Sequence, residues 1–475
     1  MNQQHQPSSQ GSNWTRREFV RAAGAGAAGL ALVRPTWAQA QAATDPLNVA
    51  IVGTGREGRI LLNLALKIPE LRFKAVCDIW SYSQRIGKGL CKRAGHKVNV
   101  YERYQDMLQA EKDLDAVIIA TPDFVHHEIT NACLNAGLHV YCEKEMSNDL
   151  EKARSMVQTA SSTGKLLQIG HQRRSNPYYI HARHLLLKDK FCGHMTAING
   201  QWNQLKPLRP MPAALTKKYG IPQEKLEEFG YGSMQEFYEW RWFNKYAGGP
   251  MTDLGSHQVD VYIWYMGKPP KAVTAFGNND HAKWEAKKYK AGYEPQCFDH
   301  TMCVYEWDSE IGTIHAYYQV LLTSSNGGFY ETFMGDEGTM RISEIRDKQA
   351  MFREKVADSL AWEDDAQKFE GDNGSVMKFD PMKSRNAKGK MTDAAAKKLM
   401  ADMEKPAHQP HIENFFAAVR DKNIKLNCPA EIGYETAVAV IKANESAVAG
   451  GRRIEFKEDD FIADASAKPD HKEQA

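Results

Sequence analysis

The chain has 475 residues, of which 42% are hydrophobic and 25% charged, and its formal net charge is +2. This length allows two or three domains with large buried cores. The nearly balanced charge argues against a nucleic-acid partner, which would favour a strongly basic face.

The first 40 residues have the pattern of an export signal. Arg16 and Arg17 form a twin-arginine motif, residues 22–33 are weakly apolar and rich in glycine and alanine, and residues 38–40 offer a small-x-small cleavage site. A flexible basic tail and a membrane anchor are the alternatives, but the apolar run is too short to span a bilayer. We therefore expect a periplasmic protein without a stable membrane span, exported by the twin-arginine route and cleaved near Ala40.

The stretch from Leu47 to Asp78 has the pattern of a dinucleotide-binding site. A short apolar strand leads into a G-x-G-x-x-G turn, a helical pattern and a second strand. The glycines permit a tight turn, let a pyrophosphate approach the backbone, and allow close packing of helix and strand. The diphosphate can then rest on the N-terminus of the helix. The residues of this turn are Gly53, Gly55, Arg56, Glu57 and Gly58.

Asp78 ends the second strand, twenty residues after Gly58. A carboxylate at this spacing can accept a hydrogen bond from the 2′-OH of the adenosine ribose. Its charge would repel a 2′-phosphate, so we expect NAD as the cofactor. Arg85, early in the next predicted helix, could accommodate that phosphate, so NADP stays possible.

Strands and helices alternate as far as residue 170, which predicts a doubly wound parallel sheet. We assign residues 41–170 to this Rossmann domain. Ligands of such sheets bind beyond the carboxyl ends of the strands. Two predicted strands end there in Thr121-Pro122 and in Glu143-Lys144.

After residue 170 the pattern changes to alternating segments, which predict antiparallel strands with one solvated face. We assign residues 171–456 to a second domain that ends in two amphipathic helices, over 411–420 and 430–449. Residues 346–406 are charged and poor in β-branched side chains, so we expect a surface insertion there. Residues 457–475 form a tail that we expect to fray after Asp464. The antiparallel strands are expected over 196–202, 301–307, 312–320 and 338–345.

Residues 207–246 are dense in aromatic side chains, Trp242 among them. Such side chains could stack on a sugar or could pin a loop. Eight cysteines show neither a CxxC pair nor zinc spacing, so we expect no metal site and no required disulfide.

Two groups are candidates for the chemistry. Lys144 ends a predicted strand at the nucleotide crevice, although a surface ion pair with Glu143 is the alternative. Asp253 and His257 are four residues apart and share one face of a predicted helix. For them, a helix cap and a core histidine are the alternatives.

With these motifs the chain resembles, over about residues 47–456, the glucose–fructose oxidoreductase, inositol dehydrogenase and rhizopine-catabolism (Gfo/Idh/MocA) family. The resemblance implies a Rossmann domain, an α/β domain with an open, mostly antiparallel sheet whose other face often makes a homodimer or homotetramer, and a final helix that returns to the first domain. By position it implies Lys144, Asp253 and His257 as the catalytic group. The other matching residues are Gly53, Gly55, Gly58, Asp78, Thr121, Pro122, His126, Glu143 and the run 429–456.

One residue departs from the family pattern. The family usually has a proline, often cis, after the Glu-Lys pair, whereas this chain has Glu145. A cis peptide bond before a residue other than proline costs about 3 kcal/mol. We therefore expect a trans bond there, or a strained one.

The resemblance implies an NAD-dependent oxidoreductase that acts on a secondary alcohol of a sugar, a sugar derivative or a cyclitol. His257 would accept the proton, Asp253 would hold its ring, and Lys144 would bind the reacting oxygen. Weaker candidates for substrate contacts are His171, Arg173 and Arg174, although the two arginines could be ordinary surface charge.

Two further expectations concern the reaction cycle. Outside the cytoplasm no pool of nicotinamide nucleotide is maintained, so we expect the cofactor to be held tightly and recycled internally. The alternative function is redox-neutral glycoside cleavage, in which oxidation, elimination and re-reduction use the same NAD. Release of free sugar without a redox partner would distinguish it.

Overall fold

The structure is a computed structural model that describes residues 45–208, 211–379, 393–466 and 469–471. The predicted export signal, with Arg16, Arg17 and the cleavage site near Ala40, lies outside the described residues. It therefore stays a prediction.

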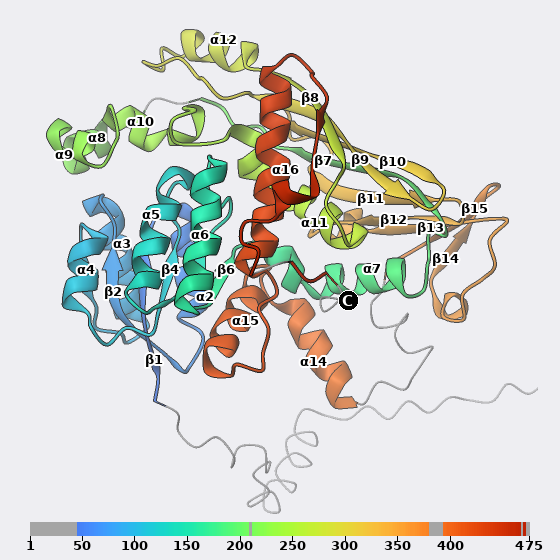
Figure 1. The fold of residues 1–475 in the computed structure, drawn as a ribbon, viewed down its shortest axis with the longest axis horizontal. Helices are drawn as coiled ribbons and strands as arrows, with labels where there is room; N and C mark the ends of the chain where they lie inside the picture. Colours follow the sequence, from blue (N-terminus) through green and yellow to red (C-terminus); the bar gives the residue numbers. More distant parts are fainter. Residues whose placement is uncertain (1–44, 209–210, 380–392, 467–468, 472–475) are drawn as a thin grey trace, which may run out of the picture. The chain divides into compact units, whose positions relative to one another are not determined.

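Six parallel strands form the first sheet, in the order β3-β2-β1-β4-β5-β6 (Figure 1). The chain builds outward from β1 in both directions, so the strand order reverses between β1 and β4, as in other doubly wound sheets. The predicted Rossmann sheet is therefore confirmed. The strands are β1 Leu47–Val52, β2 Leu71–Cys77, β3 Asn99–Tyr101, β4 Ala116–Ile119, β5 His139–Cys142 and β6 Leu167–Ile169.

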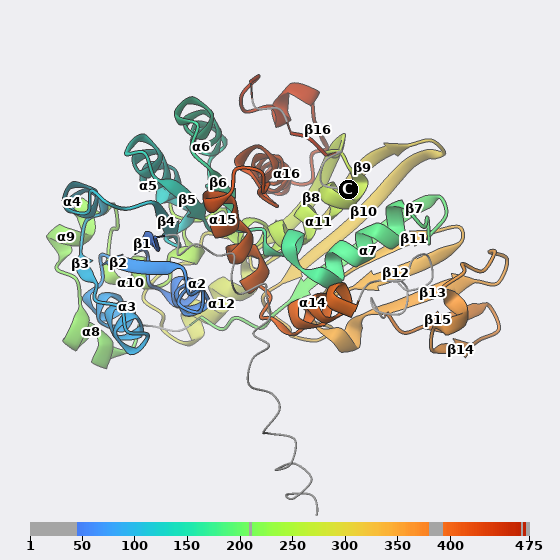
Figure 2. The same cartoon turned by 90° about the horizontal axis from the view of Figure 1, so that it is seen from below.

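Helices cover both faces of this sheet, and two of them come from the last part of the chain (Figure 2). One face packs against α4, α5, α6 and α16, and the other against α2, α3 and α15. Gly164, with φ of 63°, ends α6 in the left-handed conformation that glycine adopts readily. The helices are α2 Arg56–Ala65, α3 Ser81–Arg93, α4 Tyr104–Ala110, α5 Asp123–Asn135, α6 Leu150–Thr163, α15 Gln409–Arg420 and α16 Ala430–Val448.

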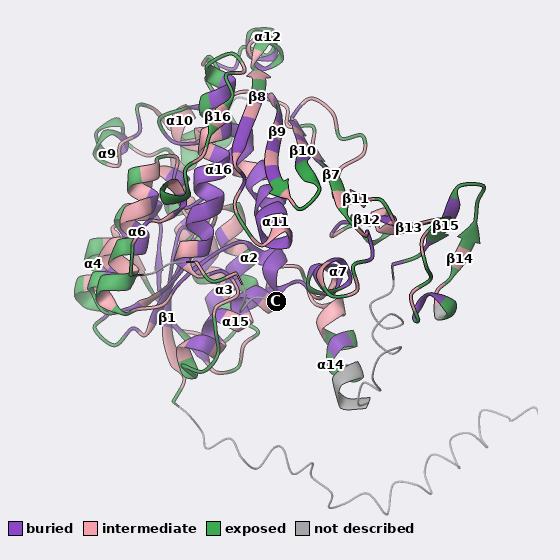
Figure 3. Ribbon diagram, turned by 45° about the vertical axis from the view of Figure 1, so that its right-hand side comes forward, coloured by how far each residue is buried: buried purple, intermediate pink, exposed green. Residues whose placement is uncertain are grey.

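The second sheet has ten strands, in the order β14-β15-β13-β12-β11-β7-β10-β9-β8-β16. Strands β7 and β10 run parallel, and the other paired neighbours are antiparallel. Helices α7, α11 and α16 pack on one face, and Figure 3 shows α11 and α16 largely buried. The strands are β7 Met195–Asn203, β8 Ala272–Asn278, β9 His300–Ser309, β10 Gly312–Leu321, β11 Phe329–Gly335, β12 Gly338–Ile342, β13 Ala350–Glu354, β14 Lys368–Glu370, β15 Gly374–Met377 and β16 Ile454–Glu455; the helices are α7 Pro177–Leu187 and α11 Ser256–Met266.

Part of the predicted surface insertion, residues 346–406, belongs to this sheet. Strands β13, β14 and β15 extend its edge, and Met351, Trp362 and Met377 are buried in its core. The expectation of a surface insertion is therefore wrong for residues 350–377. The error arose because this segment anchors itself with Met and Trp rather than with β-branched side chains. Helix α14, Asp393–Glu404, follows it.

Residues 211–246, called the strap segment below, contain three short helices beside the first sheet (Figure 1). They come from the aromatic-rich stretch and lead to the turn before α11. The helices are α8 Ala213–Tyr219, α9 Gln223–Glu228 and α10 Met234–Tyr238, followed by the turn η3 Trp240–Trp242.

The C-terminal residues pack on α6 and α16. Phe461 is buried beside the first sheet, and the Ile462 carbonyl accepts a hydrogen bond from Arg154 at 3.1 Å. Beyond Asp464, His471 Nε2 lies 3.0 Å from Glu435 Oε1. Apolar contacts therefore hold the tail in place as far as Ala463, and the fraying expected after Asp464 stays a prediction.

Three facts apply to the part of the chain that the structure describes. No helix in it is both long and apolar enough to cross a membrane. No group of three or more His, Cys, Asp or Glu side chains in it is placed to hold a metal ion. All eight cysteines lie within it, buried and without a disulfide.

Candidate active site

The turn between β1 and α2 has the shape of a pyrophosphate cradle. Gly53 has φ of 88°, and a Cβ there would collide with the carbonyl oxygen of Ala120. A Cβ at Gly58 would collide with the carbonyl oxygen of Gly53, so α2 can approach β1 only without a side chain there. At Gly55, by contrast, no atom lies within 4 Å of the Cβ position. The turn is therefore closed by its first and third glycines and open at its second.

The first turn of α2 leaves backbone amides available on this open side. The N–H groups of Arg56, Glu57 and Gly58 have no acceptor within the helix. The N-cap residue Gly55 has no side chain that could bind them. The helix dipole adds a partial positive charge at the same place. The free amides and the space at Gly55 fit the diphosphate of a nicotinamide dinucleotide.

Asp78 lies at the carboxyl end of β2, beside this turn. Its carboxylate accepts hydrogen bonds from the backbone N–H groups of Thr54, at 2.7 Å, and Trp80, at 2.8 Å. Burial raises the pKa of Asp78, and the two N–H donors oppose that shift. The carboxylate is thus fixed where an adenosine ribose would meet it. The Arg85 guanidinium lies 5.5 Å from the centre of the Tyr219 ring, directed at the strap segment.

The strap segment covers the adenosine end of this predicted dinucleotide site. The indole N–H of Trp80 donates to the Tyr219 carbonyl at 2.7 Å, and the Trp80 ring packs edge-on against Phe237, with centroids 5.7 Å apart. Lys225 forms an ion pair with Glu102 at 2.7 Å. Residues that follow β2 and β3 therefore hold the strap segment in place.

His126 braces the backbone at the other end of the crevice. Its ring nitrogens lie 2.7 Å from the carbonyl oxygens of Thr121 and Glu145. Burial lowers the pKa of His126 to about 4, so the neutral ring donates to one of these carbonyls. Because both nitrogens face backbone oxygens, we correct its role from a direct cofactor contact to a support for the loops. Thr121 and Pro122 directly precede α5 at the edge of the crevice, and Pro122 is the N-cap of the helix.

The peptide bond between Lys144 and Glu145 is cis, so the expectation of a trans bond is wrong. Glu145 is fully buried, and its carboxyl group accepts the backbone N–H of Met146 at 2.8 Å. Burial raises the pKa of Glu145 to about 8. These buried contacts, with the one to His126, are the local features that accompany the cis bond.

Glu143 and Lys144 directly follow β5 and lie inside the crevice rather than on the surface. Burial, with repulsion from Glu57, raises the pKa of Glu143 to about 8. The Lys144 ammonium donates to the backbone carbonyl of Asp253, and its Nζ lies 3.9 Å from Asp253 Oδ1. Because the Lys144 side chain is only 10% exposed, the alternative of a surface ion pair is wrong.

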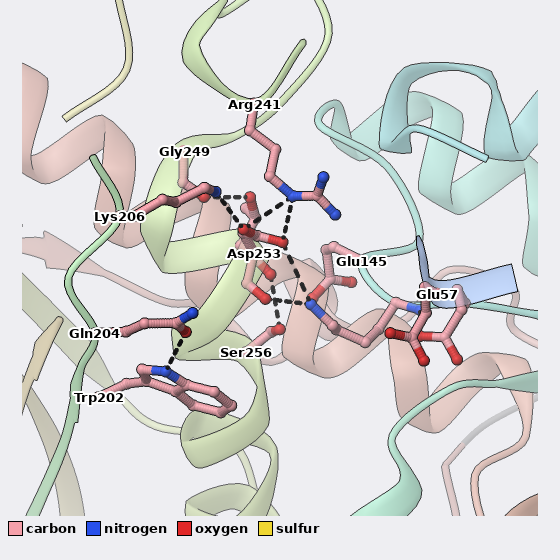
Figure 4. Close-up of polar contacts among 12 residues, drawn as sticks. Glu57, Glu145, Trp202, Gln204, Lys206, Arg241, Gly249, Asp253 and Ser256 are labelled. Atoms are coloured by element: carbon pink, nitrogen blue, oxygen red, sulfur yellow. Dashed lines mark hydrogen bonds and ion pairs between the residues drawn. The ribbon is translucent and has the colours of Figure 1, made fainter. Parts of the chain in front are cut away.

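Asp253 lies at the centre of three cations (Figure 4). Arg241 Nε donates to both carboxylate oxygens at 3.1 Å, and Lys206 Nζ lies 3.4 Å from Oδ2. Lys144 is the third cation. Burial alone would raise the pKa of Asp253, but the three cations outweigh it and hold the pKa well below its usual range. The carboxylate is therefore ionised at any ordinary pH.

His257 lies on α11, yet no hydrogen bond joins its ring to the Asp253 side chain. Among the described residues its Nδ1 has no hydrogen-bond partner, and its ring stacks on Trp202 with centroids 5.3 Å apart. Burial, with the nearby Lys144 ammonium, lowers the pKa of His257 well below its usual value. The prediction that Asp253 holds this ring is wrong, because cations attract the carboxylate more strongly than a neutral imidazole does.

His171 lies close enough to His257 to lower its pKa. The His171 side chain is 1% exposed, and neither ring nitrogen has a hydrogen-bond partner among the residues described. Burial lowers the pKa of His171 to about 4. Since buried polar atoms normally have partners, a ligand hydroxyl is a suitable one. Substrate contact by His171 stays a prediction.

Arg173 and Arg174 are buried, so the alternative of ordinary surface charge is wrong. Arg173 pairs with Glu331, and Arg174 Nε donates to both oxygens of Asp260 at 2.8 and 3.0 Å. We correct their role from substrate contacts to ion pairs that tie the segment after β6 to β11 and α11. Trp242 is only 2% exposed, so it pins the strap segment instead of stacking on a sugar.

The sequence does not mark three residues of this site. Lys206 and Arg241 show no spacing that links them to Asp253; the nearby aromatic density was the only signal. Asp123 follows Thr121-Pro122 directly, which was its only signal. Its Oδ2 has no hydrogen-bond partner among the described residues. Burial, with repulsion from Asp253, raises the pKa of Asp123 to about 7.

Known proteins resemble the chain over part of its length. Among curated relatives, the D-glucoside 3-dehydrogenase of Escherichia coli is 30% identical over 236 residues, which are 49% of this chain and 58% of that protein. The inositol 2-dehydrogenase of Rubrobacter xylanophilus is 32% identical over 139 residues, 29% of this chain and 38% of that protein. The chain thus spans about half or less of the length of these relatives.

Solved structures share the fold over most of the chain. An NAD-binding protein from Listeria innocua has a TM-score of 0.60 at 19% identity, covering 88% of this chain and 99% of its own. Levoglucosan dehydrogenase in complex with NADH has a TM-score of 0.62 at 17% identity, covering 86% and 99%.

Two family models match the chain, and together they cover about half of it. Residues 47–171 match the model described as an oxidoreductase family with an NAD-binding Rossmann fold. Residues 227–341 match the GFO/IDH/MocA C-terminal domain. With both domains matched, the chain belongs to the Gfo/Idh/MocA family of oxidoreductases.

Proposed function

We propose that the protein is an NAD-dependent dehydrogenase of a secondary alcohol on a sugar, a sugar derivative or a cyclitol. The observation that carries the proposal is the position of Lys144 beside Asp253, at the carboxyl end of β5 in the nucleotide crevice. The names of the relatives, a glucoside dehydrogenase and an inositol dehydrogenase, support a polyhydroxylated ring as the substrate. NADP stays possible because Arg85 lies on the helix after Asp78.

Each residue has a part in such an oxidation. NAD, when bound, supplies the acceptor of the hydride. The Lys144 ammonium has three N–H donors, of which the Asp253 carbonyl takes one, so another can stabilise the alcohol oxygen as negative charge develops there. A ring nitrogen of the neutral His257 accepts the hydroxyl proton. Asp253 positions the ammonium rather than the imidazole.

The test uses the purified protein with NAD or NADP and a panel of glycosides, aldoses and inositols. We expect nucleotide reduction with at least one of them, and its loss in Lys144→Ala. Lys74→Ala, which removes a half-buried lysine paired with Asp113, is the control. Reduction with none of them would overturn the proposal. Free sugar released without net reduction would instead favour redox-neutral glycoside cleavage.

We also propose that the cofactor is retained between turnovers and is re-oxidised in place by a second substrate, which takes the hydride that the alcohol gave up. Nanomolar affinity is about −12 kcal/mol. With an association rate of roughly 10⁶ M⁻¹s⁻¹ it still releases the ligand within tens of minutes. Longer retention needs a physical cover, and the contacts of Trp80 with the strap segment support one.

Mass spectrometry of the nucleotide that the dialysed protein releases on denaturation tests retention and separates NAD from NADP. We expect stoichiometric nucleotide in the wild type and little in Trp80→Ala. In the control Trp284→Ala, which removes an exposed tryptophan of α12 (Asp280–Lys288), retention should be normal. A wild-type protein that comes out empty contradicts the proposal.

We further propose a periplasmic location, reached by the twin-arginine route. Export of a folded, loaded protein would agree with a retained cofactor. Replacing Arg16 and Arg17 by lysine should leave the precursor in the cytoplasm. Unchanged periplasmic levels of that variant would remove the twin-arginine assignment.

We propose a homodimer or homotetramer formed through the open face of the ten-stranded sheet. Phe276 on β8 and Met302 on β9 are paired across the strands there, with exposed fractions of 58% and 39%. Light scattering should show an oligomer in the wild type and a smaller species in Phe276→Asp. A monomeric wild type would disprove it.

A further inference from the structure

The group around Asp253 carries more positive charge than Asp253 neutralises. Five other acidic side chains affect these cations from farther away: Glu57, Asp123, Glu143, Glu145 and Glu239. Burial raises the pKa of Asp123 and Glu239 to about 7, and that of Glu143 and Glu145 to about 8. Among the described residues, however, Asp253 is the one carboxylate within ion-pair distance of the three cations. The cations are Lys144, Lys206 and Arg241.

Arg241 and Lys206 have donors to spare. Arg241 binds Asp253 through Nε, and its two terminal nitrogens, which point away from Asp253 in Figure 4, have no hydrogen-bond partner among the described residues. Its guanidinium lies 4.2 Å from the centre of the Trp240 ring, which fixes the plane of the fork. The side chains of Arg241 and Lys206 are 39% and 30% exposed, so a ligand can reach them.

The negative charges of the dinucleotide would be bound by other parts of the site, not by Arg241 and Lys206. Its diphosphate fits the amides at the start of α2, and a 2′-phosphate would lie near Asp78 and Arg85. The surplus cations lie instead beside Lys144, where the alcohol would be oxidised. Their charge therefore serves the substrate side of the site.

We propose that the substrate carries a carboxylate, as uronic and aldonic acid derivatives do, and that Arg241 and Lys206 bind it. The inference rests on the dehydrogenase function proposed above. The free edge of a guanidinium offers two parallel N–H groups that match the two oxygens of a carboxylate, and Lys206 adds a point charge. Lys144 stays available for the reacting hydroxyl. The carboxylate takes no part in the oxidation, so Arg241 and Lys206 determine specificity.

Matched pairs of substrates test this inference. Methyl glycosides and methyl glycosiduronates of one configuration differ only in whether C6 is an alcohol or a carboxylate. We would measure kcat/KM for each member with NAD, and its binding to the NADH-saturated protein by calorimetry. In the best pair we expect the uronate to be favoured at least tenfold in both measurements.

Three variants assign the effect to residues. Arg241→Gln and Lys206→Gln should each reduce the preference for the uronate by about 10- to 100-fold, the range of a charge-assisted hydrogen bond. Arg341→Gln is the matched control, because Arg341 also lies over an aromatic ring, Tyr330 at 4.6 Å, but on β12 and with no contact to Asp253. It should leave the preference unchanged.

The outcomes separate this inference from the function on which it rests. If neutral glycosides bind and react as well as uronates, or if hexose 6-phosphates bind more tightly than uronates, the carboxylate site is disproved and the dehydrogenase stands. If no compound is oxidised, the proposed function fails. Calorimetry of uronate binding then still tests whether Arg241 and Lys206 form a carboxylate site. Uronate binding that Arg241→Gln abolishes would then support it, and no uronate binding would overturn it.

Discussion

The two halves of the site are built in opposite ways. The dinucleotide half is one continuous stretch, from Gly53 to Asp78, in which missing side chains and free amides make the binding surface. The substrate half is assembled from side chains that lie far apart in the sequence and hold each other by charge. Its charged residues are Lys144, Lys206, Arg241 and Asp253. The shape of the dinucleotide half is thus determined by one local stretch of sequence. The balance of charges in the substrate half arises only when the chain has folded.

If the two halves are independent, the substitutions with the largest effect should lower kcat without changing the affinity for the nucleotide. Lys144→Ala and His257→Ala should each lower kcat by about 10²–10⁴-fold, the range for loss of a proton-transfer or charge-stabilising group. Nucleotide affinity, measured by fluorescence titration of NADH, should stay within a few-fold of wild type. A large loss of affinity in both variants would show that the two halves are coupled.

Within the dinucleotide half, two alanine substitutions should distinguish an effect on the stability of the fold from an effect on the binding of NAD. Gly58→Ala forces a Cβ against the carbonyl oxygen of Gly53, so we expect about 1–3 kcal/mol of lost stability. Gly55→Ala projects into open space and should keep the stability of the apo protein but bind NAD at least tenfold more weakly. Thermal unfolding with and without NAD measures both. If the two substitutions changed stability and NAD binding to the same extent, the assignment of this turn as the pyrophosphate-binding site would be refuted.

The pH dependence tests the substrate half. Because the pKa of His257 is lowered, its ring should stay neutral, and able to accept a proton, as the pH falls through 6.5. The acid limb of kcat/KM should therefore lie well below pH 6.5. With an ordinary pKa of about 6.5, activity at pH 5.5 would drop roughly tenfold. A limb near pH 7 that disappears in Asp123→Asn or in Glu239→Gln would assign the titration to that carboxyl group. A limb that persists in both variants would contradict the low pKa of His257.

This contrast also explains how much could be predicted. The Rossmann sheet, its glycine turn and the edge position of Lys144 follow from local patterns of apolar residues, glycines and strand ends. The partners of Asp253 do not, because Arg241 and Lys206 reach it from segments with no periodic relation to it. The expected contact between the His257 ring and Asp253 was wrong for the same reason. The spacing of the two residues along the sequence does not show that cations compete for the Asp253 carboxylate.

The smallest effect is expected at the strap segment. The ion pair of Lys225 with Glu102 joins side chains that are 47% and 36% exposed, and such pairs contribute less than about 1 kcal/mol. Lys225→Ala should therefore change the free energy of unfolding by less than that, as measured by denaturant titration. A loss above about 2 kcal/mol would mean that charge, and not the packing on Trp80, holds the strap segment.

The packing of α15 and α16 on the six-stranded sheet also sets an order of events during synthesis. The last strand of that sheet ends at Ile169, whereas α15 begins at Gln409 and α16 ends at Val448. At about 5–20 residues per second, the ribosome needs tens of seconds to make the intervening chain. Until then apolar residues of β1 and β5, which face α15 and α16 in the finished protein, have no cover from these helices. The nucleotide domain is thus begun first and completed last, and a nascent chain is exposed to chaperones and proteases for that interval.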